Sequence, residues 1–370
     1  MDKDTGECST HKAYDTEQKT WRHLNFFEHK CYLHCRTPRV KLKSGKVRQI
    51  SPPWSGLSNG FTLLFEALIL ELCTHMPIQA VSRIVSENNG KLWRLLHKYI
   101  GTLRSLEDFS SVKTVGIDET NRAKGHDYVS LFVDLEQSRT IYITSGKSSD
   151  TITSFVDDLE SHRGSRDQIT DVSCDMSPAF IKGVHDNLPN ADITFDKFHI
   201  VKIINEAVDQ VRREEVKHQD ILKGCRYLFL KNNSNLTIKQ KIELDNLQLS
   251  KFRLKSIRAL EIREAFQEIY QAFSVRSFEY LLKKWYFWAT HSRLQPIKEA
   301  AYTIKRHWDG VVNWKKSQIN NGILEGLNSI IQAAKSRARG FRNVEYFKMM
   351  AYLVTANFNF AKVNKYAMSV

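Results

Sequence analysis

The chain of 370 residues contains little cysteine and no long hydrophobic run. Its 6 cysteines follow no clear pairing pattern, which indicates a reducing, cytoplasmic environment. The longest apolar stretch, Phe61 to Cys73, is interrupted by Glu66 and Glu71, so no membrane span is expected. The first residues, MDKDTGECST, do not resemble a signal peptide, and no internal repeat or low-complexity run is found.

Positive charge exceeds negative charge in this sequence. Lys and Arg total 55 against 41 Asp and Glu, which gives a net charge of +14 and a pI near 9.4. Such an excess indicates a polyanionic partner, nucleic acid above all, although a basic and merely solvated surface is the alternative. Hydrophobic residues make up 42% of the chain, enough for a folded protein of two or more domains.

The middle of the chain has the pattern of strands that alternate with helices. Three strands are expected first, followed by helix, strand, helix, strand and a long helix, at 112–118, 127–135, 139–145, 149–162, 168–174, 177–188, 191–195 and 197–218. This is the order of a ribonuclease H-like α/β domain, whose mixed five-stranded sheet has the first strand at its centre and the fourth beside it. No strand pattern occurs over 215–300, where we expect an all-α insertion.

Three acidic residues lie where these elements would bring them to one point. Asp118 ends the first strand, Asp175 follows the fourth, and Glu325 is on a helix expected to start near Asn321. Gathered carboxylates repel one another unless a cation lies between them, and oxygen-rich clusters bind Mg²⁺ or Mn²⁺. With the positive charge excess, the cluster predicts two-metal chemistry on a nucleic-acid phosphodiester. Any one of the three alone is equally well explained as a solvated surface residue.

Other residues could support such a site. His199, near the start of the long helix, could help at the metal site or bind phosphate, but a buried core histidine is at least as good an interpretation. A basic run after Glu325 predicts contacts with a DNA backbone, with a solvated helix face as the alternative. The run contains Lys335, Arg337, Arg339 and Arg342.

The region before the predicted sheet divides into two parts. Residues 1–50 contain candidate zinc ligands at loose spacing, and whether they bind zinc stays open. These ligands are Cys8, His11, Cys31 and Cys35. After a linker near 51–60, three short helices with tight turns resemble a helix-turn-helix module, or else a helical linker that packs on the next domain. The predicted domains are 1–50, 51–110, 111–214, 215–300 and 301–370.

Over nearly its whole length the sequence resembles the ISL3 family of bacterial insertion-sequence transposases. The similarity is carried, in order, by WRHLNFFEHKCYLH, GFTLLFEALIL, VGIDETNRAKGHDYVSLFVDL, DMSPAFIKGV, ITFDKFHIVKIINEAVD and NGILEGLNSIIQAAKSRARGFRN. The resemblance implies a DDE-type transposase with a ribonuclease H-like core, in which Asp118, Asp175 and Glu325 occupy the catalytic triad positions and use Mg²⁺ or Mn²⁺. It also implies a helix-turn-helix that recognises terminal inverted repeats, action on target DNA as a homodimer or larger assembly, and a bacterial cytoplasmic, nucleoid-associated location.

One departure from the family concerns zinc. Its members usually begin with two pairs of zinc ligands, and Leu42 and Gly45 stand where the second pair is expected. We therefore expect a truncated or decayed zinc segment. This leaves a catalytically unproductive, DNA-binding relic that binds inverted repeats as an alternative function, and a structure-selective nuclease on the same fold as a third.

Overall fold

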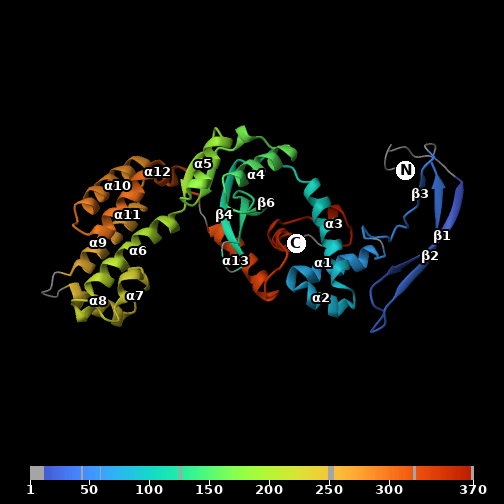
Figure 1. The fold of residues 1–370 in the computed structure, drawn as a ribbon, viewed down its shortest axis with the longest axis horizontal. Helices are drawn as coiled ribbons and strands as arrows, with labels where there is room; N and C mark the ends of the chain where they lie inside the picture. The colour runs from blue at the N-terminus through green and yellow to red at the C-terminus, as the bar shows by residue number, and fades with distance from the viewer. Residues whose placement is uncertain are drawn as a thin grey trace.

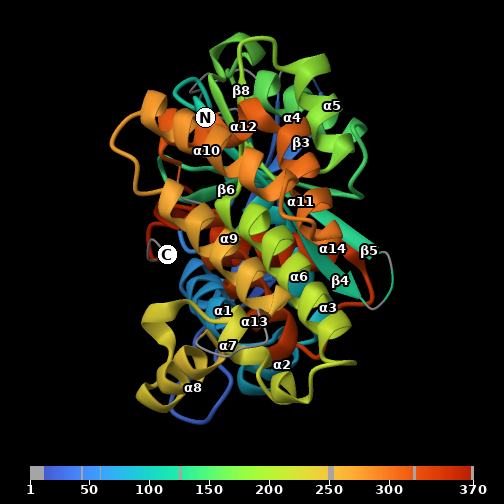
Figure 2. The same cartoon turned by 90° about the vertical axis from the view of Figure 1, so that its left-hand side faces the viewer.

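The computed structural model describes residues 12–42, 45–58, 60–123, 125, 127–248, 254–319 and 322–367. Its parts form an arch, with a helical insertion at one end, a five-stranded sheet in the middle, and a helical module and N-terminal sheet at the other end (Figure 1). The insertion helices lie in front of the sheet when the molecule is viewed from that end (Figure 2). Within the described residues, none of the helices combines the length and apolar composition that a bilayer span requires.

The central sheet confirms the ribonuclease H-like α/β fold. Its strands run in the order β6-β5-β4-β7-β8, with β4 antiparallel to β5 and parallel to β7. Their bounds are β4 Thr114–Ala123, β5 Asp127–Asp134, β6 Arg139–Ser145, β7 Asp171–Cys174 and β8 Asp192–Phe195. The prediction that the first strand ends at Asp118 is wrong. β4 continues because its polar second half still pairs with β5, as in the pair Thr120 and Val129.

Helices cover both faces of this sheet. Val115 and Ile117 of β4 belong to one core with Phe155 of α4 (Asp150–Ser161) and with residues of α5 (Pro178–Asn187). The opposite face packs against α13 (Gly322–Arg337) and α14 (Val344–Thr355). Gly116 lies at this second contact, where an added Cβ would stand 2.9 Å from Leu324 of α13. The glycine therefore lets α13 lie close against the centre of the sheet.

The insertion is entirely helical, as predicted. The long helix α6 runs from the sheet edge into it and packs against α9 and α11. Trp285 is buried there and donates its indole N–H to the carbonyl oxygen of Ile262 at 2.8 Å. The predicted boundary at residue 300 falls inside α11. The helices are α6 Lys197–Glu215, α7 Arg226–Leu230, α8 Ile238–Gln248, α9 Lys255–Ile269, α10 Val275–Thr290, α11 Gln295–Arg306 and α12 Trp308–Ser317.

The helical module consists of α1 (Leu63–His75), α2 (Ile78–Val85) and α3 (Asn89–Ser105). Its buried polar centre is Glu66, which accepts hydrogen bonds from the backbone N–H of Leu57 at 2.9 Å and Ser58 at 2.7 Å and from the Tyr99 hydroxyl at 2.7 Å. Burial raises the pKa of Glu66. The segment predicted as a linker is thus bound to the module through this carboxylate.

The N-terminal sheet was not predicted. It consists of three antiparallel strands, β1 (Ala13–Arg22), β2 (Tyr32–Lys41) and β3 (Val47–Gln49). Cys31 directly precedes β2 and Cys35 lies within it, so extended backbone separates them by about 13 Å. Ligands of one zinc ion lie much closer together, so the strand holds these two candidate ligands too far apart to share one zinc ion. Cys8 and His11 lie outside the described residues.

Candidate active site

Two of the three predicted carboxylates are neighbours at the same edge of the sheet. Gly116 of β4 pairs in parallel with Ser173 of β7, and the same register continued by two residues places Asp118 beside Asp175. The carboxylate of Asp175 accepts a hydrogen bond from the backbone N–H of Ser177 at 2.9 Å, which holds it just ahead of α5. The predicted strand order thus brings together residues that are far apart in the sequence.

Helix α13 carries the third carboxylate across this edge. One helical turn of four residues rises about 6 Å, close to the rise of two strand residues, so α13 contacts β4 at regular steps. Leu324 packs over Gly116. One turn further along α13, Asn328 Nδ2 donates to Asp118 Oδ2, and after another turn Gln332 Nε2 donates to Thr120 Oγ1 at 2.6 Å. Glu325 is in the first turn of this helix and is exposed.

Asp118, Asp175 and Glu325 line one cavity of about 150 Å³. Asp196 and His199 line the same cavity. The sequence analysis did not include Asp196 among the candidate site residues. A signal was present: Asp196 directly follows β8, as Asp175 directly follows β7, and both strands end at the same edge of the sheet.

The electrostatics of the cavity favour a bound cation. Burial raises the pKa of Asp118 and of the adjacent Glu119, and the nearby Asp175 carboxylate acts in the same direction on both. The hydrogen bond from His199 Nδ1 to Asp196 Oδ2, 3.0 Å long, raises the pKa of the histidine. The structure therefore places a protonatable imidazole among crowded carboxylates.

The donor set fits a hard divalent cation. It is rich in carboxylate oxygen, the ligand type that Mg²⁺ and Mn²⁺ prefer. Asn328 Oδ1, beside Asp118, is buried and has no hydrogen-bond partner among the described residues. Over the same residues, no three His, Cys, Asp or Glu side chains already surround one point as metal ligands.

The basic run lies at the junction of the sheet and the helical module. Lys335 donates to Gln332 and to the Asn121 carbonyl oxygen, and Arg337 donates to the His75 carbonyl oxygen. Arg339 and Arg342 are exposed. The three arginines line a groove of about 530 Å³ together with Arg83 and Trp93 of the module, which the sequence reasoning missed. The prediction of DNA contact thus suits the arginines better than Lys335.

Comparison with known proteins decides the family. Residues 115–351 match the family of ISL3 DDE transposases, described as "Transposase". The chain belongs to this family. Residues 51–100 of the transposase match the "Helix-turn-helix domain of transposase family ISL3", so α1 to α3 are a helix-turn-helix module.

Two curated relatives cover most of this transposase. The transposase for insertion sequence element IS1001 of Bordetella parapertussis is 27% identical over an alignment of 349 residues, and the match covers 91% of this chain and 84% of that protein. The transposase for insertion sequence element IS1557 of Mycobacterium tuberculosis is 25% identical over an alignment of 371 residues, gaps included, and the match covers 91% of this chain and 82% of that protein. A chain from a cryoEM structure of a simian T-cell lymphotropic virus intasome matches 52% of this chain and 74% of its own at 14% identity, but its TM-score of 0.19 supports no structural argument.

Proposed function

We propose that this transposase cuts DNA at the ends of its insertion sequence and joins the freed 3′-hydroxyl to target DNA. The observation that carries the proposal is the shared cavity of Asp118, Asp175 and Glu325, which come from the middle of β4, the residue after β7 and a distant helix. A solvated surface role does not explain why three acidic residues from separate elements face one small cavity.

In this proposal the three carboxylates hold divalent ions. Two Mg²⁺ or Mn²⁺ ions would activate the attacking oxygen and stabilise the leaving oxygen. Asp118 and Asp175 hold their places through the β4–β7 register, and Glu325 completes the set from α13. His199, whose pKa is raised by Asp196, is suited to hydrogen-bond a phosphate oxygen of the DNA in the cavity.

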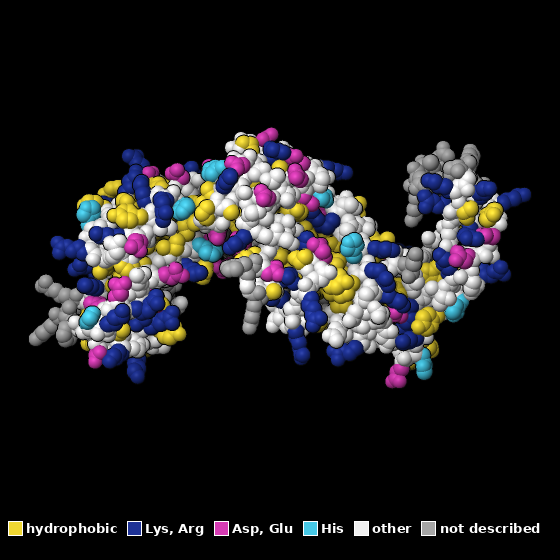
Figure 3. Space-filling model, in the orientation of Figure 1, with side chains coloured by type: hydrophobic (Ala, Val, Ile, Leu, Met, Phe, Trp, Pro, Cys, Tyr) yellow, Lys and Arg dark blue, Asp and Glu magenta, His cyan; other side chains and the backbone are white. Residues whose placement is uncertain are grey.

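The surface charge supports DNA as the partner. Lys and Arg side chains are spread over the insertion at one end and over the helix-turn-helix module and N-terminal sheet at the other (Figure 3). We propose that the module recognises the terminal inverted repeats and that Arg339 and Arg342 contact the backbone beside it. A homodimer or larger assembly on DNA also belongs to the proposal.

Cleavage of labelled element-end DNA in Mn²⁺ tests the function. We expect Asp118→Asn and Glu325→Gln to abolish cleavage and to leave binding of the duplex unchanged. Asp192→Asn is the matched control, because Asp192 is exposed at the opposite end of β8 and should leave cleavage intact. Cleavage retained in either triad variant would refute the mechanism.

The same assay separates the alternatives. A DNA-binding relic would bind the ends and leave them uncut in the wild-type protein. A structure-selective nuclease would cut branched DNA and produce no joined product.

A further inference from the structure

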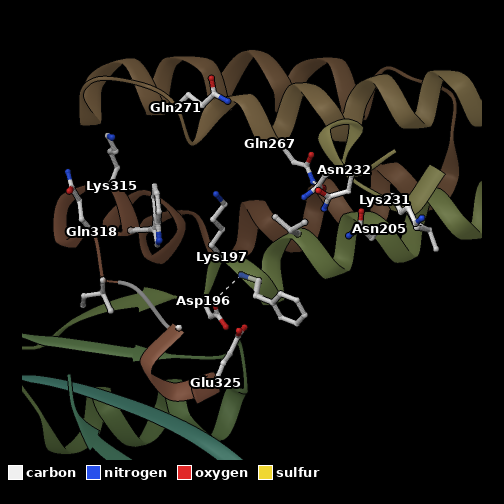
Figure 4. A pocket seen from close by; sticks show the side chains of 17 residues that line it. Asp196, Lys197, Asn205, Lys231, Asn232, Gln267, Gln271, Lys315, Gln318 and Glu325 are labelled. Atoms are coloured by element: carbon white, nitrogen blue, oxygen red, sulfur yellow. Dashed lines mark hydrogen bonds between the residues drawn. The ribbon is translucent and has the colours of Figure 1, made fainter. Parts of the chain in front are cut away.

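A second, larger groove of about 1000 Å³ opens beside the catalytic cavity (Figure 4). It lies between α12 and α13 on one side and α6, α9 and residues 230–235 on the other. Asp196, Phe198 and Glu325 line both the groove and the cavity. We propose that this groove binds a single-stranded DNA segment next to the cleavage point, and that Phe198 stacks on an unpaired base. The inference rests on the proposed function, because it places this strand at the same active site.

The side chains of the groove match the chemistry of exposed bases and phosphates. Amide side chains offer both donors and acceptors, which suits the edges of unpaired bases. Lysines suit the phosphates. The amides are Asn205, Asn232, Asn235, Gln267, Gln271 and Gln318, and the lysines are Lys197, Lys231 and Lys315. Among the described residues, acidic side chains line the groove only where it meets the catalytic cavity, at Asp196 and Glu325.

Several of these amide groups have unused hydrogen-bonding capacity. Asn205 Oδ1 is shielded from solvent and has no hydrogen-bond partner within the described part of the chain. Gln267 Nε2 donates to Asn232 Oδ1 at 3.1 Å, which leaves the Gln267 oxygen as an acceptor and the Asn232 nitrogen as a donor. One acceptor and one donor from opposed amides form the pattern that a base edge can satisfy.

Phe198 and Lys197 stand where the groove meets the catalytic cavity. Phe198 is 60% exposed and lines both the groove and the cavity. The Lys197 ammonium lies 4.4 Å from the centroid of the Tyr270 ring and 5.5 Å from that of Trp314. These cation–π contacts hold Lys197 in position, and its side chain extends into the groove (Figure 4).

The composition of the groove favours a single strand over a duplex. In a duplex the Watson–Crick edges are already paired and the base faces are stacked, so an exposed aromatic ring has little to contact and amides reach only the base edges in the grooves. A duplex-binding surface presents mainly cations to phosphates, whereas here six amides accompany three lysines. Duplex contacts are better supplied by the helix-turn-helix module and the exposed arginines near it.

Binding of two fluorescent DNA probes tests the inference. One probe is a blunt duplex of the element end, and the other is the same duplex with a short single-stranded 3′ extension of thymidines. We expect the wild-type protein to prefer the extended probe. Phe198→Ala should weaken binding of the extended probe by about 5- to 150-fold, the range for loss of one base-stacking contact, and leave the blunt probe unchanged.

Two further variants make the test specific. Phe287→Ala removes a phenylalanine that is 64% exposed on α10 and does not line the groove, so it should leave both affinities unchanged. Gln267→Leu keeps the size of the side chain, removes its hydrogen bonds, and should also reduce the preference for the extended probe. Equal binding of the extended probe by wild type and Phe198→Ala, or an equal loss in Phe287→Ala, would overturn the inference.

The outcome also separates this inference from the proposed function. If the wild-type protein binds the blunt duplex and cleaves it with Mn²⁺ but shows no preference for the extension, only the groove inference is wrong. If it neither binds nor cleaves element-end DNA, both are wrong.

Discussion

Replacement of Asn328 by leucine should weaken metal use without removing a metal ligand. Asn328 donates a hydrogen bond to Asp118 Oδ2 from the middle of α13 and thereby fixes the direction of that carboxylate. A hydrogen bond to a charged group contributes about 1.5–3 kcal/mol, and loss of a group that orients a metal ligand typically costs about 10- to 100-fold in metal affinity or activity. We therefore expect Asn328→Leu to need about 10- to 100-fold more Mn²⁺ for half-maximal cleavage.

Cleavage rates measured over a Mn²⁺ titration provide the assay. The variant should recover most of its rate at high Mn²⁺, because Asp118 itself is still present. Gln332→Leu is the matched control, since Gln332 lies one turn further along the same helix face and bonds Thr120 instead of a carboxylate. Its metal dependence should equal that of the wild type. A wild-type metal dependence in Asn328→Leu, or an equal shift in Gln332→Leu, would refute the positioning role.

Three further predictions concern stability. Gly116→Ala should destabilise the protein by about 1–3 kcal/mol in thermal melts and slow cleavage, because the added Cβ would push Leu324 and α13 away from the sheet. Gly326→Ala is the control: its Cβ would stand in open space, so it should be neutral or stabilising. Tyr99→Phe should lower the free energy of unfolding in urea by about 1.5–3 kcal/mol, because it removes the hydroxyl that donates to the Glu66 carboxylate, and an unchanged midpoint would contradict this. Burial raises the pKa of Glu66 above 4.5 in the folded protein. The wild type should therefore lose stability relative to Glu66→Gln as the pH rises from 4.5 through the raised pKa. A difference in melting temperature between the two proteins that is independent of pH would contradict this.

The sheet and the convergence of Asp118 with Asp175 could be predicted because both depend on element order. A strand, a helix and a second strand form a parallel unit with few possible arrangements. The element order also matches the ribonuclease H-like architecture, in which the fourth strand lies beside the first. The extension of β4 beyond Asp118 could not be read in this way. Its residues are polar, and only their pairing with β5 makes them a strand. The N-terminal sheet escaped prediction for a similar reason, since both of its long strands are largely polar.

Contacts between distant elements were the main feature that could not be predicted from the sequence. The periodicity of the insertion helices shows which side chains are buried, but it does not show which element they pack against. The groove between Phe198 and Gln267 therefore has no signature in the sequence. Asn328 and Asp196 were also missed, because only tertiary contacts connect them with the site. Asn328 bonds Asp118 on another element, and Asp196 lines the same cavity as the three carboxylates.

The most direct test of the metal site is anomalous diffraction from crystals of the full chain soaked in MnCl₂. We predict anomalous density in the cavity, within bonding distance of Asp118, Asp175 and Glu325, and its loss in crystals of Asp118→Asn. A cavity without manganese in the wild-type crystals, or undiminished density in the variant, would contradict the claim that these three carboxylates form the metal site.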